Sequence, residues 1–413
     1  MSGDLRRRAV EARIAVSLGK VSVREALERL GEGLEPRDRG LLLHLVAGTT
    51  RSLLTLDHLL SRHASRRLDR MDPPVREALR IGAFQVLFCS RIPVHAAVGT
   101  AVEAAKALEP RGAGTVNAIL RALSGEVLER GEDLDHCQFS VPVLPEGDPL
   151  SASLLSIRFS LPAWLLERWL ARFGPAETER LARQALQPPP VTLRPRGGGD
   201  PLPSQGGDVT SQPGWAEGEF SVQDATAQAV VSEGVRPRSG ERVLDLCAGV
   251  GGKATAMAEA GAKVTALDLS GSRLERLRVL AERLGLKSLE IVQGDALKPP
   301  AEWAGTFDAV LLDAPCTNSG VLRRRPEARW RLSPEDPARM AVLQKRLLEA
   351  ALPCVKAGGR LVYSTCSLET EENEGVCSAF PSFPREEERL TLPSAEADGG
   401  YWCRFLGTQG LGA

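Results

Sequence analysis

The sequence predicts two structural classes in one chain, an all-α N-terminal domain and a C-terminal α/β domain with a parallel, doubly wound sheet. Apolar residues recur at three- and four-residue spacing through the first 125 residues, and hydrophobic strands alternate with amphipathic helices from Gly240 onward. The length of 413 residues agrees, because it exceeds one ordinary core. We expect a helical domain over 1–135, a connector over 136–220 and the α/β domain over 221–413.

The first domain is predicted from its helical periodicity, which no alternating β-branched run interrupts. The predicted helices span 6–17, 23–30, 37–63, 74–87, 99–108 and 115–123. Arg62, Arg66, Arg67 and Arg70 form a basic cluster within this domain. Its interpretation stays open between a solvated face and contact with nucleic-acid phosphates.

The connector carries two further helical patterns over 160–185. Seven Pro and six Gly then occupy the 28 positions from Gln187 to Gly214. Pro lacks a backbone N–H and Gly is conformationally permissive, so we expect this stretch to be a loop or linker.

The α/β domain is predicted from strand, turn and helix patterns that alternate along the chain. Strands are expected at 242–249, 263–269, 289–295, 307–315 and 359–367, and helices at 251–261, 272–285 and 337–352. Hydrophobic strands in this alternation are typical of a parallel sheet with helices on both faces.

Composition excludes several classes of protein. With 43% hydrophobic and 25% charged residues, the chain is neither disordered nor collagen-like. The 52 Lys and Arg residues against 53 Asp and Glu residues give a net charge of −1, which excludes a strongly basic chain but not a local basic face. No apolar run reaches the ~18 residues of a membrane span, and the charged N-terminal segment has no signal-peptide core. We therefore expect a cytoplasmic protein without a membrane segment.

Cysteine and histidine spacing predicts no metal site. The eight Cys residues include no C-x-x-C pair, and all five His residues lie in the first third of the chain. A reducing compartment also argues against a disulfide framework. Chemistry beyond residue 140 would need carboxylates, thiols, Lys or Tyr as proton carriers.

Ligands of a doubly wound sheet bind beyond the carboxyl ends of its strands. The first such end carries a glycine-rich loop: Cys247, Ala248, Gly249, Val250, Gly251, Gly252 and Lys253. Asp268 ends the next strand, where a carboxylate can accept both hydroxyls of a ribose. Gly249-x-Gly251-x-x-Ala254 also fits a dinucleotide fingerprint, so the glycines alone do not separate a methyltransferase from a nicotinamide dehydrogenase. Asp295 ends the third strand, either beside an adenine or as a helix N-cap.

Two cysteine motifs, Asp313-Ala-Pro-Cys316 and Ser364-Thr-Cys366, end neighbouring predicted strands. Both thiols can therefore face one pocket, and their polar surroundings differ from those of a buried structural Cys. C5 of cytosine is a weak nucleophile, and addition of a thiolate at C6 activates it toward a methyl donor. Asp313 is placed to act as an acid toward N3 of the base if desolvation keeps it protonated.

These motifs carry a resemblance to a known family. The Asp313–Trp330 stretch and the Leu361–Glu369 stretch followed by Glu372 and Asn373 resemble the RNA 5-methylcytosine methyltransferases. The segments around His95 and Asn117 resemble the end of a NusB-type domain. The chain is most similar to the bacterial small-subunit ribosomal RNA methyltransferase B family, which implies a NusB-like domain followed by a Rossmann-like class I methyltransferase domain dependent on S-adenosylmethionine.

The resemblance also implies residue roles. Cys366 would add to C6 of the cytosine, and Cys316 would assist product release. Residues 247–253, Asp268, Asp295 and Asp313 would line the cofactor site. We also hypothesise that Lys253 lowers the pKa of a thiol, a role suggested by its charge rather than by the family.

A basic segment follows the first cysteine motif. Arg323, Arg324, Arg325, Arg329 and Arg331 lie within nine residues that also include Trp330. A solvated loop is the plain interpretation, but we expect these side chains to guide single-stranded RNA, because an extruded base needs charge neutralisation and a stacking partner.

The expected activity is methylation of C5 of a cytosine in 16S rRNA by a monomer that acts on the rRNA or on a small-subunit assembly intermediate. The same chemistry on tRNA or 23S rRNA is one alternative. A non-catalytic NusB-like RNA-binding factor is another, and it predicts no effect of replacing Cys366. A nicotinamide dehydrogenase would leave both cysteine motifs unexplained.

Overall fold

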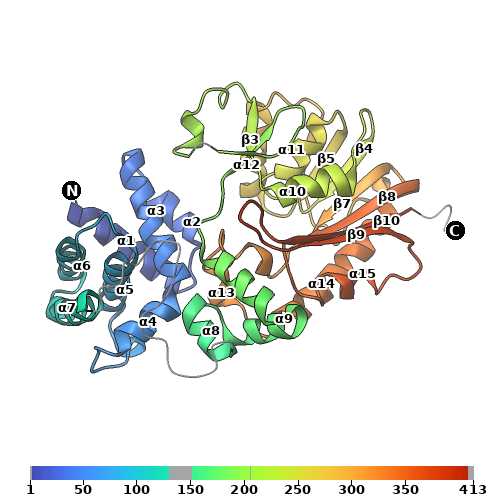
Figure 1. Ribbon diagram of the computed structural model, residues 1–413. Coiled ribbons are helices and arrows are strands. Elements are labelled where there is room, and N and C mark those ends of the chain that lie inside the picture. Colours follow the sequence, from blue (N-terminus) through green and yellow to red (C-terminus); the bar gives the residue numbers. More distant parts are fainter. Residues whose placement is uncertain (1, 130–150, 205, 408–413) are drawn as a thin grey trace. The chain divides into compact units, whose positions relative to one another are not determined.

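The computed structural model describes residues 2–129, 151–204 and 206–407. They form two compact units, each described separately below (Figure 1). The helical unit comprises Met1–Pro188 and Leu322–Arg331, and the sheet unit comprises Pro189–Val321 and Leu332–Ala413. This division differs from the three predicted segments, since the connector contributes to both units. The predicted boundary after residue 135 lies outside the described residues.

The helical unit confirms the all-α prediction. Its longer helices are α1 (Ser2–Ser17), α2 (Val23–Leu30), α3 (Pro36–Arg51), α4 (Leu53–Ser61), α5 (Pro73–Phe88), α6 (Val94–Leu108), α7 (Ala113–Glu129), α8 (Ala152–Phe159) and α9 (Ala163–Leu186). The helix predicted over 37–63 is broken at Ser52, where α3 ends and α4 begins. The two helices predicted over 160–185 are confirmed as the two halves of α9, which meet at Gly174 with a non-helical φ of 77°, directly before Pro175. Helix α8 was not predicted.

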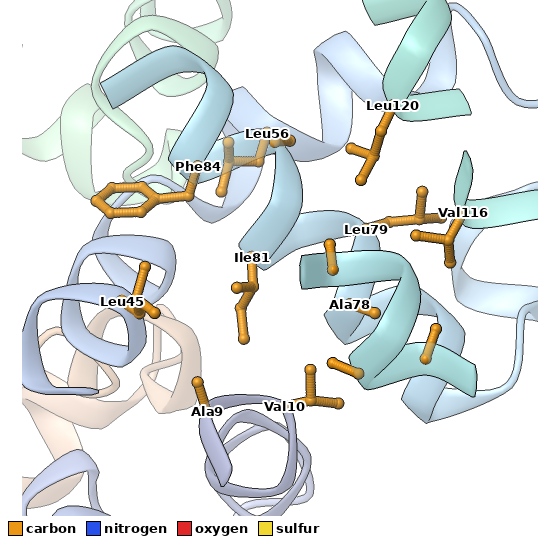
Figure 2. Close-up of a cluster of buried hydrophobic side chains, with 14 of the residues drawn as sticks. Ala9, Val10, Leu45, Leu56, Ala78, Leu79, Ile81, Phe84, Val116 and Leu120 are labelled. Atoms are coloured by element: carbon orange, nitrogen blue, oxygen red, sulfur yellow. The ribbon is translucent and has the colours of Figure 1, made fainter. Parts of the chain in front are cut away.

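Helix α5 forms the centre of the helical core, as Figure 2 shows. Its apolar positions recur at helical spacing and pack against α1, α3 and α7. The side chains involved include Ala9, Val10, Leu45, Ala78, Leu79, Ile81, Phe84, Val116 and Leu120. Glu77 is also fully buried on α5, and it pairs with Arg13 at 3.0 Å and with Arg80 at 2.6 Å. These partners compensate part of the cost of burying its charge.

The sheet unit contains a seven-stranded mixed sheet. Its order is β6 (Leu289–Gln293), β5 (Lys263–Asp268), β4 (Arg242–Leu246), β7 (Phe307–Asp313), β8 (Val355–Thr365), β10 (Gly400–Leu406) and β9 (Arg385–Thr391). The first five strands are parallel, as predicted, whereas β10 runs antiparallel to β8 and to β9. The strand order reverses between β4 and β7, which is the switch point at which such sheets bind ligands.

Both faces of this sheet are covered, which explains why its central strands are continuously hydrophobic. Successive residues of β7 alternate between two cores, with Ala309 and Leu311 in one and Val310 and Leu312 in the other. The first core also contains side chains of α11 (Gly252–Glu259) and α12 (Gly271–Arg283), and the second contains side chains of α14 (Asp336–Ala351). Figure 1 shows α14 and the short α15 (Glu374–Cys377) beside the strands.

The Pro- and Gly-rich stretch contains regular structure, so its prediction as a loop was partly wrong. Strands β1 (Thr192–Pro195), β2 (Leu202–Pro203) and β3 (Phe220–Val222) form a small antiparallel sheet. Pro195 ends β1 and Pro203 ends β2, and the missing N–H is tolerated at such strand ends. Arg194 of β1 is buried, pairs with Glu259 of α11 at 3.1 Å and donates to the Gly252 carbonyl oxygen at 2.7 Å. The small sheet is thereby attached to α11, the helix that follows the glycine loop.

Between β3 and β4 the chain forms α10 (Ala225–Ala229) and a π-helical turn, η4 (Val230–Val235). Among the described residues, no helix has the length and apolar character that crossing a lipid bilayer would require.

Candidate functional site

The predicted site residues of the sheet unit follow the carboxyl ends of parallel strands. The glycine loop follows β4, Asp268 ends β5, Asp313 ends β7, and Cys366 comes directly after β8. Strands β7 and β8 are paired in parallel with Asp313 opposite Ser364. The two cysteine motifs therefore leave the sheet side by side.

The two thiols lie in contact. Cys316 Sγ is 3.2 Å from Cys366 Sγ, and both residues are partly buried rather than enclosed in hydrocarbon. The Cys366 thiol donates to Asn318 Oδ1 at 3.3 Å, and Asn318 Nδ2 donates to the Cys316 carbonyl oxygen at 2.8 Å. Asn318 has a φ of 63°, a left-handed conformation that Asn tolerates better than most residues. One side chain thus bridges the two cysteine motifs.

The Cys316 thiol resists ionisation. The pKa of the Cys316 thiol lies well above its ordinary value, first because of its hydrogen bond with Cys366 and then because of burial. The negative charges of Cys366 and Glu372 raise it further. A second anion beside the first is disfavoured, so the pair can hold one thiolate and one thiol.

Lys253 and Asp313 form an ion pair beside the thiols. Lys253 Nζ donates to Asp313 Oδ2 at 2.6 Å, and Ser364 Oγ donates to Asp313 Oδ1 at 2.6 Å. Burial alone would lower the pKa of Lys253, but the charge of Asp313, the hydrogen bond to it and the charges of Asp245 and Cys366 raise it overall. Lys253 is therefore a cation at neutral pH, within electrostatic reach of Cys366.

Both oxygens of Asp313 accept hydrogen bonds. One oxygen accepts from the Lys253 ammonium and the other from the Ser364 hydroxyl. Its side chain is also about one-third exposed (33%). The Lys253 ammonium is therefore a second candidate for the acid toward N3 of a cytosine, beside the predicted Asp313.

The glycine loop is organised around Asp268. Gly249 N donates to Asp268 Oδ2 and Ser270 N donates to Asp268 Oδ1, both at 2.8 Å. Gly251 has a φ of 86°, and a Cβ there would lie 1.9 Å from Leu277 Cδ1. The turn therefore requires glycine at this position for both conformation and space.

The residues of this region fit the expected S-adenosylmethionine. An ionised carboxylate has about four acceptor positions, so Asp268 retains capacity for ribose hydroxyls beyond its two backbone donors. Asp245 is buried at the end of β4, and neither of its oxygens has a hydrogen-bond partner. Burial first, and then the charges of Asp313 and Asp268, raise its pKa well above the ordinary value. Unsatisfied buried polar atoms of this kind often mark the place of a missing ligand or water.

Two predicted cofactor residues, Cys247 and Asp295, lie in contrasting environments. Burial raises the pKa of Cys247 to about 12, and the carboxylates around it add to this effect, so its thiol is neutral. Asp295 is exposed, and its side chain accepts from Leu297 N at 2.9 Å. This contact caps a turn after β6 and not the start of a helix, so the predicted helix N-cap is not formed, and the contact with adenine stays a prediction.

The basic segment of residues 323–331 belongs to the helical unit, and two of its arginines are buried. Arg329 is fully buried and donates to four carbonyl oxygens, those of Arg51, Ser160, Ala185 and Leu322. Burial is the first cause that lowers the pKa of Arg329, to about 9, and the nearby Arg51 adds to it. Trp330 Nε1 donates to the Thr50 carbonyl oxygen at 2.8 Å.

The expectation that all these arginines guide RNA therefore needs correction. Arg323 is 2% exposed and Arg329 is 0% exposed, so neither presents its charge to a ligand in this structure. Arg324 is partly exposed, and Arg325 and Arg331 are exposed. Spacing alone could not show which side chains of the segment face inward.

Sequence reasoning assigned no role to Glu372, which the structure places between the cysteine motifs. It is fully buried, and its carboxylate accepts from Thr317 and Ser367, the residues directly after Cys316 and Cys366. A signal existed in the sequence, since each cysteine is followed by a hydroxyl residue. Among the described residues, no group of His, Cys, Asp and Glu could hold a metal ion.

The comparisons with known proteins agree with this geometry. Residues 233–400 match the family model for the 16S rRNA methyltransferase RsmB/F, and residues 4–124 match the NusB family. The chain is similar to a probable ribosomal RNA small subunit methyltransferase B of Synechocystis sp., with 35% identity covering 87% of this chain and 84% of the relative. It is also similar to the ribosomal RNA small subunit methyltransferase B of Citrobacter koseri, with 33% identity, 93% of this chain and 94% of the relative.

Solved structures support the fold. The match to the crystal structure of PH0851 spans 97% of this chain and 98% of the PH0851 chain, with a TM-score of 0.74 and 25% identity. A methyltransferase homolog protein from Pyrococcus horikoshii covers 63% of this chain and 99% of its own, with a TM-score of 0.55 and 23% identity. With identity above 30% across most of both chains for the curated relatives, the protein belongs to the ribosomal RNA small subunit methyltransferase B family.

Proposed function

We propose that this protein transfers a methyl group from S-adenosylmethionine to C5 of a cytosine in 16S rRNA through a covalent adduct on Cys366. The observation that carries the proposal is the thiol pair, 3.2 Å apart beside the Lys253–Asp313 ion pair. The names of the curated relatives favour the small subunit over tRNA or 23S rRNA. The substrate is either the rRNA itself or a small-subunit assembly intermediate, and we propose a cytoplasmic, monomeric enzyme.

In the proposed reaction, the Cys366 thiolate forms a bond to C6, and the electron pair of the C5–C6 double bond is delocalised toward N3 and O2. Lys253 stabilises the charge that develops there. S-adenosylmethionine, when bound, supplies an electrophilic methyl group on a positively charged sulfur. C5 takes the methyl group, its proton then leaves, and the C6–sulfur bond breaks to restore the double bond.

Cys316 serves the last step in this proposal. Its raised pKa keeps it as a thiol, and the contact with Cys366 lets it donate a hydrogen bond to the departing thiolate. With no histidine in the sheet unit's sequence, a thiol is the nearest donor to the sulfur that must leave. The C5 proton is taken by a water or a carboxylate.

The test compares Cys366→Ala and Cys316→Ala on isolated 16S rRNA, 23S rRNA and tRNA, with 5-methylcytosine mapped by bisulfite sequencing. We expect Cys366→Ala to lose methyl transfer more than about a thousandfold, since the nucleophile is absent. We expect Cys316→Ala to accumulate a covalent RNA–protein complex visible on a denaturing gel. Methyl transfer by Cys366→Ala would contradict the covalent mechanism. Methylation of tRNA or 23S rRNA but not of 16S rRNA would contradict the proposed substrate.

A further inference from the structure

Four donors from three segments converge on the carboxylate of Glu372. Thr317 N donates to Oε1 at 2.9 Å and Gln344 Nε2 donates to the same oxygen at 3.0 Å. Ser367 Oγ donates to Oε2 at 2.5 Å, and Thr317 Oγ1 donates to Oε2 as well. Glu372 is 0% exposed, so water does not compete for these positions. The carboxylate thus binds both cysteine motifs at once.

The donors are the immediate neighbours of the reactive residues. Thr317 follows Cys316 and Ser367 follows Cys366, so each cysteine is directly adjacent to a residue that donates to Glu372. Gln344 of α14 also donates to the carbonyl oxygen of Pro315 at 2.9 Å, on the other side of Cys316. A displacement of Glu372 would therefore move both thiols.

Glu372 is itself fixed to the sheet. The Tyr363 hydroxyl on β8 donates to the Glu372 carbonyl oxygen at 2.5 Å, and the neighbouring Asn373 accepts from Thr365 Oγ1 at 2.6 Å. Asn373 Nδ2 also donates to the Ser367 carbonyl oxygen at 2.9 Å. The carboxylate is therefore a fixed reference point at the end of β8, not a side chain on a free loop.

The arrangement is costly for stability alone. The four donors named above are all neutral, and burial raises the pKa of Glu372 while its hydrogen bonds partly offset that effect. A well-packed apolar group in such a place is often as stable as a buried charge or more so. A carboxylate offers what an apolar group does not, two oxygens that each accept two hydrogen bonds and hold two loops in one register.

We propose that Glu372 is a positioning residue that holds Cys316 and Cys366 at the separation needed for both to act on one pyrimidine ring. The use of that separation in catalysis rests on the proposed function, whereas the separation itself can be measured without RNA. Other contacts also join the motifs: Asn318 bridges the two cysteines, Gly320 N donates to the Cys366 carbonyl oxygen at 2.9 Å, and Leu368 N donates to Ser319 Oγ at 2.8 Å. These contacts do not depend on the Glu372 side chain.

The experiment uses phenylarsine oxide, which releases water as its arsenic bonds to two nearby thiols. Full-length wild type, Glu372→Ala and Glu372→Gln are titrated without RNA or cofactor, and Cys316→Ser identifies the signal that belongs to this pair. We expect bridging to weaken about tenfold or more in Glu372→Ala, because the effective concentration of one thiol near the other falls. Glu372→Gln retains much of it, since its amide can donate to the two hydroxyls that now donate to the carboxylate.

The matched control is Glu77→Gln, which alters an equally buried carboxylate in the helical unit. It is expected to lower the melting temperature but to leave bridging unchanged. In a methyl-transfer assay, Glu372→Ala should lower kcat by about 10- to 100-fold with KM for S-adenosylmethionine unchanged, as misplacement of reacting groups does.

Unchanged bridging in Glu372→Ala would overturn the proposal, as would an equal loss in Glu77→Gln, which would make the effect one of stability. If Glu372→Ala does not fold, Glu372→Gln carries the test: a small loss of bridging and of kcat supports the proposal, and wild-type values of both overturn it. If Glu372→Ala loses bridging and the wild-type protein methylates no RNA, the positioning role is supported and the proposed function is contradicted.

Discussion

Three carboxylates at neighbouring strand ends show how partners decide the role of one residue type. Asp313 binds a cation and a hydroxyl, Asp268 binds two backbone N–H groups, and buried Asp245 has no hydrogen-bond partner. The pKa of Asp245 is raised well above its ordinary value by burial and by the other two charges. The sequence showed three aspartates at suitable positions, but not the partners that each of them binds.

Lys253 is the residue whose charge most directly affects the nucleophile. In Lys253→Met the cation is lost and Asp313 keeps an uncompensated charge, so the Cys366 thiolate is disfavoured for both reasons. We expect alkylation of Cys366 by iodoacetamide at neutral pH to slow about three- to tenfold, measured by mass spectrometry of the peptide that contains Cys366. Lys263→Met, at an exposed position at the start of β5, serves as the control. An alkylation pH profile identical to that of wild type would show that Lys253 does not act on this thiol.

At the scale of elements, the regular strands and helices followed from local pattern. The five parallel strands and the helices between them carry continuous or periodic apolar residues, and the structure has them where the pattern predicts. The antiparallel strand β9 was not predicted, because it is largely charged and exposed and gives no hydrophobic signal. Strands β1 and β2 lie in a Pro- and Gly-rich stretch, where tertiary attachment through Arg194 overrides weak local preference.

The loop between β4 and α11 allows a test on two adjacent glycines. Gly251→Ala places a Cβ at a φ of 86° and 1.9 Å from Leu277 Cδ1, whereas a Cβ at Gly252 meets nothing nearer than Gln223 Nε2 at 3.5 Å. We expect Gly251→Ala to lose about 1–3 kcal/mol of stability and to bind S-adenosylmethionine more weakly. Thermal unfolding and calorimetric titration measure the two effects. Gly252→Ala should match wild type in both, and equal loss in the two variants would contradict the assignment of the requirement to Gly251.

The candidate site illustrates the same limit of prediction. The proximity of Cys316 and Cys366 could be predicted because both follow predicted neighbouring strands. The carboxyl ends of neighbouring parallel strands lie side by side. The position of Glu372 could not be predicted, because it lies beyond the strand in an irregular segment whose course depends on Tyr363 and Asn373. Periodicity describes which face a residue occupies, but it contains no information about hydrogen bonds between irregular segments.

At the scale of the whole molecule, Arg329 attaches residues 322–331 to the helical unit. Arg329→Met removes four hydrogen bonds to buried carbonyl oxygens, and we expect a loss of about 2 kcal/mol, since unsatisfied buried acceptors cost more than the relief of one buried charge. The melting temperature should fall by about 4–8 °C. Arg325→Met changes an exposed neighbour and should leave the melting temperature unchanged. If Arg325→Met were the more destabilising of the two, the packing described for the segment would be wrong.

The chain crosses from one unit to the other after Pro188, after Val321 and after Arg331. The two folds are consequently not modules that a single cut can separate. A fragment beginning at Pro189 would carry Trp330 and a buried guanidinium with nothing to cover them, and a fragment ending at Pro188 would lack the side chains that fill its interior. To exchange the helical unit between relatives, in the laboratory or in evolution, residues 322–331 must therefore be exchanged together with residues 1–188.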